Sequence, residues 1–174
     1  MKKLIKNTHP KKQGFIITCI VILLLSAFTA SAQKADFSGK WSRDTDRTTL
    51  GESLSINSVP VLLEVSQTTD AISITHHSVN GKGESHAYNE TIRFGGSPAT
   101  VAVTPNLNKS SALHWSADQK SFTDVATFTD AQGNPSQKNT QTWSLSDGGK
   151  TLTIHAVIES DGQTFTADEV FNRE

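Results

Sequence analysis

Two histidines and a glutamate form the most chemically suggestive group in this sequence. His76, His86 and Glu90 lie in two neighbouring segments of alternating polarity, 71–79 and 85–94. If a three-residue loop, 80–82, joins these segments as a hairpin, His76 lies opposite His86, and Glu90 lies further along the same face. Two imidazoles and a carboxylate could bind Zn²⁺ or Cu²⁺. The sequence has no compact ligand motif, so we expect these histidines to be solvated or hydrogen-bonded and the protein to hold neither a metal nor another cofactor.

Signatures of catalysis are absent from the sequence. No Gly-x-Ser-x-Gly elbow places a serine nucleophile, and the glycines of segment 81–83 lack the strand-to-helix context of a phosphate loop. Asp168 and Glu169 are adjacent on an expected strand, so they face opposite sides and cannot work as an acid/base pair. The single cysteine, Cys19, precedes the expected domain. We therefore expect a protein that is not an enzyme.

The first 32 of the 174 residues have the order of a secretory signal peptide. Five lysines and no acidic residue come first, an apolar run covers 15–28, and Ala30 and Ala32 occupy the A-x-A positions. The apolar run is shorter than the roughly 20 residues that span a membrane, so cleavage between Ala32 and Gln33 is favoured over a membrane anchor. The sequence thus predicts a signal peptide, 1–32, and one exported domain, 33–174, in a periplasm or outside the cell.

The expected domain is acidic. The leader contains five of the 16 Lys and Arg residues and none of the 17 Asp and Glu residues, so 11 basic and 17 acidic residues remain, a net charge of −6 with histidine neutral. A chain of that sign does not attract nucleic acids or anionic membranes. Without cysteine, the domain must be stabilised by packing rather than by disulfides. We expect no nucleic-acid partner and no membrane insertion after cleavage.

After residue 33, short runs of alternating polarity recur between turn sequences such as Asn80-Gly81 and Asp161-Gly162. A period of two is typical of strands with one buried face, and these turn dipeptides are typical of hairpins. Sequential antiparallel strands twist, and closing the sheet removes its exposed edges. The pattern predicts an all-β, antiparallel up-and-down barrel of about 8–10 strands, with a two-sheet sandwich as the alternative. Segment 44–58 is irregular and could form a helical turn, a loop over an opening, or both.

The alternation also predicts which side chains face the interior. An apolar wall with a few polar groups is how small-molecule sites are built, although barrels of this size can also fill with their own side chains. Both outcomes are open at this point. The residues that we expect to contact a ligand in the lumen are His76, His86, Tyr88, Glu90, Ile92, Trp115, Gln141 and Trp143.

Both ends of the expected domain resemble a known family. "FSGKW", ending at Trp41, is similar to the Gly-x-Trp of the lipocalin/calycin superfamily, and "TWSLSDGGKTLTIHAVIESDGQTFTADEVFNRE", 142–174, is similar to the terminal hairpins of small exported bacterial lipocalin-like domains. The resemblance implies that Trp41 plugs one end of the barrel and that Arg173, on the last strand, lies across its ring. Gly39 would leave room for the bend of the chain.

Two functional hypotheses follow from this sequence. The first is an exported binding module for a small, largely apolar ligand. The alternative is a protein–protein module, either a hydrolase inhibitor or an envelope-associated structural domain, with segment 44–58 and the N-terminus of the domain as contact elements. An open cavity favours the ligand, whereas a filled barrel with an exposed apolar patch favours a protein partner.

Overall fold

The computed structural model describes residues 33–174, and the predicted signal peptide lies outside these residues. This part of the chain is almost entirely β-structure. Its elements in chain order are β1 (Gly39–Arg43), β2 (Thr49–Leu50), the 3₁₀ helix η2 (Ile56–Ser58), β3 (Leu62–Gln67), β4 (Ala71–Val79), β5 (Ser85–Arg93), β6 (Ala99–Thr104), β7 (Leu107–Trp115), β8 (Ser121–Asp130), β9 (Pro135–Ser146), β10 (Thr151–Ser160) and β11 (Gln163–Arg173). Among these residues, no helix has the length and apolar character needed to cross a membrane.

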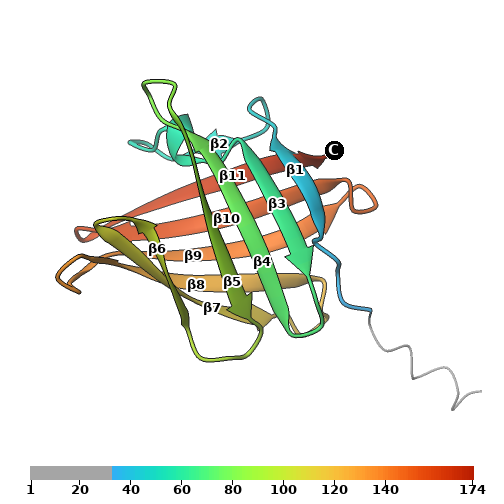
Figure 1. The fold of residues 1–174 in the computed structure, drawn as a ribbon. Helices are drawn as coiled ribbons and strands as arrows, with labels where there is room; N and C mark the ends of the chain where they lie inside the picture. Colours follow the sequence, from blue (N-terminus) through green and yellow to red (C-terminus); the bar gives the residue numbers. More distant parts are fainter. Residues whose placement is uncertain (1–32) are drawn as a thin grey trace, which may run out of the picture. The chain divides into compact units, whose positions relative to one another are not determined.

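One continuous antiparallel sheet curls on itself to form the predicted barrel. The strand order is β5-β4-β3-β1-β11-β10-β9-β8-β7-β6, and β2 pairs with β11. In Figure 1, β3, β4 and β5 cross the front while β8, β9 and β10 run behind them at a steep angle. Across the gap between the edge strands, an isolated bridge joins Phe94, just after β5, to Leu113 on β7, and Gly95 N donates to Leu113 O at 3.0 Å. The structure is therefore a nearly closed barrel, not a sandwich.

The β4–β5 hairpin corrects the predicted register. Its loop covers 80–84 rather than 80–82, so His76 lies opposite Tyr88, and His86 lies opposite Ser78. Asn80 causes the longer loop because its Oδ1 accepts hydrogen bonds from the backbone N–H groups of residues 82 and 84. Side-chain bonds of this kind stabilise turns locally. Each residue still faces the predicted side of the sheet, because the partner of His76 moved by two residues, from His86 to Tyr88, and a shift by two keeps every side chain on its face.

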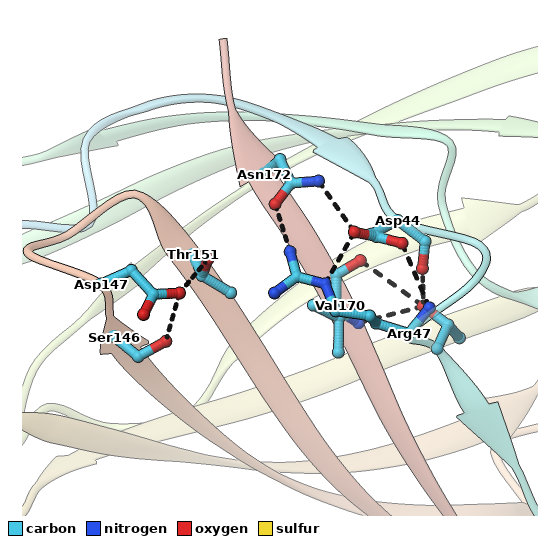
Figure 2. A network of polar contacts seen from close by, with 8 residues as sticks. Asp44, Arg47, Ser146, Asp147, Thr151, Val170 and Asn172 are labelled. Carbon is cyan, nitrogen blue, oxygen red and sulfur yellow. Dashed lines mark hydrogen bonds and ion pairs between the residues drawn. The ribbon is translucent and has the colours of Figure 1, made fainter.

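The irregular segment after β1 is held beside β11 (Figure 2). Asp44 accepts from Arg47 Nε at 2.8 Å and from Asn172 Nδ2 at 3.0 Å, and Thr48 Oγ1 accepts from Val170 N at 3.1 Å. The segment then pairs with β11 through β2 and ends in η2. It forms a short helical turn and a loop, and both were among the outcomes that the sequence left open for 44–58.

Trp41 is fully buried at the end of the barrel where β1 begins and β11 ends. Its Nε1 donates to Phe37 O at 2.9 Å, and Arg173 Cζ lies 4.2 Å from the centre of its ring. Gly39 has φ +141°, and a Cβ built on it would lie 2.8 Å from Arg173 Nη1. Arg173 itself is held by its Nε, which donates to Gly149 O at 2.8 Å. The geometry explains why a glycine precedes the tryptophan here: a side chain would displace the guanidinium.

Aromatic rings fill the interior next to Trp41. Phe37 packs edge-on against Phe122 with 4.8 Å between ring centres, and Phe122 stacks on Trp143 at 5.2 Å. Phe94 and Trp115 extend this cluster, with 4.7 Å between their ring centres. This half of the barrel is therefore filled by its own side chains.

Candidate functional site

A cavity of about 270 Å³ occupies the other half of the barrel, toward the hairpins β4–β5, β8–β9 and β10–β11. Trp143 belongs both to the aromatic cluster and to the cavity wall, so it forms the floor. Asn57, Ser58 and Pro60, in and just after η2, lie in the wall near the mouth. The apolar part of the wall is formed by Leu63, Val103, Phe128, Trp143, Ile154 and Ile158; the polar part includes His76, Tyr88, Lys109, Gln137, Asn139, Gln141 and Glu169.

A buried ionic network lies beside the cavity. Lys109 Nζ on β7 donates to Glu90 Oε1 on β5 at 2.8 Å and to Asp124 Oδ2 on β8 at 3.0 Å. His76 Nε2 on β4 lies 2.8 Å from Glu90 Oε1, and the Tyr88 ring stacks on the His76 ring at 4.4 Å. The charged ends of Glu90, Lys109 and Asp124 are all buried. The network thus joins four strands through side chains.

The network crosses the open seam of the barrel. The strand order ends at β5 on one side and at β6 on the other, and the described chain has no β-ladder between these two edges. Lys109 belongs to the β6–β7 side, whereas Glu90 belongs to the β5 side. The ion pair therefore provides a side-chain link between edges that are joined by one bridge rather than by a ladder of backbone hydrogen bonds.

Electrostatics fix the protonation states of this network. Burial lowers the pKa of His76, an effect that the hydrogen bond to Glu90 only partly offsets, so His76 is neutral at pH 7 and donates to the carboxylate. Burial opposes ionisation of Glu90, but the His76 hydrogen bond and the Lys109 charge outweigh it and lower the pKa of Glu90 to about 2. Burial raises the pKa of Asp124 despite the nearby Lys109. The pKa of Lys109 is raised because the charges of Glu90 and Asp124 outweigh its burial.

Glu169 is a second buried acid, and it is on the cavity wall. The residue is 8% exposed, and within residues 33–174 no protein group hydrogen-bonds to its carboxyl. Burial raises the pKa of Glu169 to about 7, although the charge of Arg43 opposes the shift. Arg43 is held elsewhere, since its Nη1 donates to the backbone oxygens of Ile56 at 2.7 Å and Val59 at 2.8 Å. Near neutral pH, this carboxyl is thus poised between its two protonation states.

We expect Glu169→Gln to stabilise the protein at pH 8 and to have little effect at pH 5. The pKa of Glu169 is higher in the folded protein than the ordinary value near 4.5, so the unfolded chain loses its proton first as the pH rises. The wild type therefore loses stability between about pH 4.5 and pH 7, by up to about 3 kcal/mol, and an uncharged amide avoids that loss. Urea unfolding at both pH values measures the difference.

The control for this experiment is Glu159→Gln, because Glu159 is an exposed carboxylate on β10 that pairs only with Lys138 across 3.5 Å. This variant should change stability little at either pH. A Glu169→Gln effect of equal size at pH 5 and pH 8 would contradict the assigned titration.

The predicted lumen residues divide into two groups in the structure. His76, Tyr88, Gln141 and Trp143 line the cavity, and His86 lies at its exposed mouth. Glu90 lies behind the wall and bonds Lys109, whereas Ile92 is in the core. Trp115 packs in the aromatic cluster at the other end. The interior is thus filled at one end and open at the other, which resolves the two outcomes that the sequence left open.

The candidate metal triad that the sequence offered, His76, His86 and Glu90, does not come together. His86 pairs with Ser78 instead of His76, and the Glu90 oxygen near His76 also accepts from Lys109. Within the described part of the chain, no group of three His, Cys, Asp or Glu side chains is placed to hold a metal ion. The error came from the assumed loop length.

Sequence reasoning missed Lys109 and Asp124. Asp124 is in step with Phe122 and Phe128, so the alternation of β8 could have placed it inside. Lys109 is in step with Leu113 on β7, which begins at Leu107, so the same alternation could have placed it inside. The signals that could have revealed the pair were an acidic residue on the buried face of β8 and the start of β7 at Leu107. By contrast, the prediction that Asp168 and Glu169 face opposite sides is confirmed, since Asp168 is exposed and Glu169 is buried.

Solved structures share this architecture. The barrel is similar to zebrafish ileal bile acid-binding protein complexed with cholic acid, with a TM-score of 0.52, 12% sequence identity, and coverage of 79% of this chain and 98% of that one. The likeness is one of fold: an antiparallel β-barrel. It is also similar to the fluorescent protein UnaG (TM-score 0.49, 12% identity, 79% and 97% covered) and to secretory abundant heat soluble protein 4 of Ramazzottius varieornatus (0.46, 11%, 79% and 94%). No family model and no curated protein matches the sequence.

Proposed function

We propose that this calycin-type barrel is an exported, non-catalytic binding protein that holds a small, largely apolar ligand. The observation that carries the proposal is the cavity of about 270 Å³ above the Trp143 floor, with apolar walls and a few convergent polar groups. Ligand sites in proteins have this composition. A solved barrel with the same fold is complexed with cholic acid, which supports a ligand inside the barrel.

The size of the cavity limits the ligand. Its volume equals that of about nine liquid water molecules at roughly 30 Å³ each. This lies just below the range of about 300–1,000 Å³ typical of pockets for drug-sized ligands. The ligand is therefore a compact molecule, such as one with a single bicyclic ring system and a short polar arm.

The proposed export follows from the leader, 1–32, and places the barrel in a periplasm or outside the cell. An acidic domain of net charge −6 is expected to meet its ligand in solution rather than on an anionic membrane.

The proposal is tested by blocking the cavity with a tryptophan. Ile158 lines the cavity, so Ile158→Trp should abolish binding of the neutral fluorescent probe 2-(1-naphthyl)ethanol, measured by titration calorimetry. Val157→Trp is the matched control, because Val157 is the adjacent residue on β10 and faces outward between Thr140 and Thr166. It should leave binding unchanged.

Equal binding to both variants would place the probe outside the cavity. A wild-type protein that binds none of a panel of naphthyl probes would contradict the proposed function and favour the alternative, a module that binds another protein.

A further inference from the structure

The proposed site contains an acid that the protein itself leaves without a partner. Glu169 is on the cavity wall, more than nine-tenths buried, and receives no hydrogen bond from the described residues. A buried carboxyl is normally hydrogen-bonded or paired, because leaving it alone costs free energy. The carboxyl of Glu169 therefore lacks a hydrogen-bond donor, and a ligand in the cavity would be placed to supply one.

No unpaired lysine or arginine of residues 33–174 lines the cavity. The positive charge of Lys109 on the wall is paired with Glu90 and Asp124. Arg43 is not on the wall: its Nη1 donates to two backbone oxygens, and its buried Nε has no hydrogen-bond partner among the described residues. His76 donates to Glu90, while Tyr88 stacks on His76, and His86 lies at the exposed mouth. An anionic ligand would therefore find no free lysine or arginine on the described cavity wall, and it would face the charge of Glu169.

The amide row of β9 adds acceptors rather than positive charge. Gln137, Asn139 and Gln141 alternate along one face of the strand and line the cavity. Asn139 Oδ1 is buried and has no hydrogen-bond partner among residues 33–174. Gln141 Oε1 receives only a long bond, 3.4 Å, from Trp143 Nε1. A ligand that donates hydrogen bonds would satisfy these oxygens as well.

We propose that the cavity selects a small organic cation, a primary amine on an apolar body, whose ammonium group binds Glu169, and that it rejects carboxylates of the same shape. The inference rests on the proposed function, because it assigns the ligand class of the same cavity. The amine lies deep, since Glu169 pairs with Ile154, which in turn pairs with the floor residue Trp143. The apolar body fills the space toward Ile158 and Phe128. This preference is the opposite of that expected for a barrel that holds an acid.

The test compares three probes that share one ring system: the amine 2-(1-naphthyl)ethylamine, the alcohol 2-(1-naphthyl)ethanol and the carboxylate 1-naphthaleneacetate. Calorimetric titrations at pH 8, where Glu169 is ionised, should give a dissociation constant for the amine at least about tenfold below that of the alcohol. The acetate should bind most weakly. Glu169→Gln should remove the advantage of the amine and keep the binding of the alcohol.

Glu159→Gln is the control for the loss of one carboxylate, because Glu159 is an exposed residue on the neighbouring strand β10. It should leave the ratio of amine to alcohol binding unchanged. If the alcohol binds but the acetate binds as tightly as the amine, or if Glu169→Gln leaves that ratio unchanged, the inference fails while the proposed function stands. If none of the three probes binds, both fail.

Discussion

Replacing Lys109 with methionine should destabilise the barrel by about 3–5 kcal/mol, the cost of breaking a buried ion pair by removing one partner. The substitution keeps the length of the side chain but removes the only cation that contacts the Glu90 and Asp124 carboxylates in the described chain. Both acids would stay buried at the seam between β5 and β7, where no ladder holds the edges together. Urea unfolding monitored by tryptophan fluorescence measures the loss.

Two further variants separate the charge effect from simple packing. Lys138→Met removes a half-exposed lysine whose ion pair with Glu159 is 3.5 Å long, so it should change stability little. Adding Glu90→Gln and Asp124→Asn to Lys109→Met removes the orphaned charges and should recover a large part of the lost stability. If Lys109→Met were no more harmful than Lys138→Met, the network would not hold the seam.

Trp41→Ala should also lower the free energy of unfolding by about 3–5 kcal/mol, as large-to-small changes in a packed core do. The indole is fully buried, and its removal opens a void beneath the aromatic cluster and frees the Phe37 carbonyl oxygen. For a domain of this size, the melting temperature should fall by roughly 10 °C or more. Differential scanning calorimetry of residues 33–174 gives the comparison.

Arg173→Gln distinguishes the contribution of the Trp41 ring to stability from that of the guanidinium that covers it. The guanidinium lies 4.2 Å from the ring centre, and a cation–π contact contributes about 0.5–2 kcal/mol. This variant should therefore melt between the wild type and Trp41→Ala. An unchanged melting temperature for Trp41→Ala would show that the tryptophan does not close this end.

The faces of the strands could be predicted from the sequence, because side-chain alternation is a local property of extended backbone. Along β4, Ile72, Ile74 and His76 are all buried, as the period of two predicts. The same local logic set Asp168 and Glu169 on opposite faces of their strand, and the structure has Glu169 buried and Asp168 exposed. That logic also favoured a barrel over a sandwich, because alternating strands and turn sequences follow one another along the chain. In the structure, strands next to each other in the chain pair from β3 to β5 and from β6 to β11, whereas β1 pairs with β3 and β11, and β2 pairs with β11.

Register, closure and the state of the interior were decided by the tertiary structure. The Asn80 side chain lengthened one loop and moved His86 away from His76, which no alternation pattern reveals. Lys109 on β7 reaches Asp124 on the neighbouring strand β8, but it meets Glu90 only because the sheet curls until β5 comes close to β7. Whether the lumen is filled or hollow depends on how rings from distant strands pack, so the cavity above Trp143 and the unpartnered carboxyl of Glu169 appear only once the barrel has closed. Periodicity determines which way a side chain points, whereas non-local packing determines what it meets there.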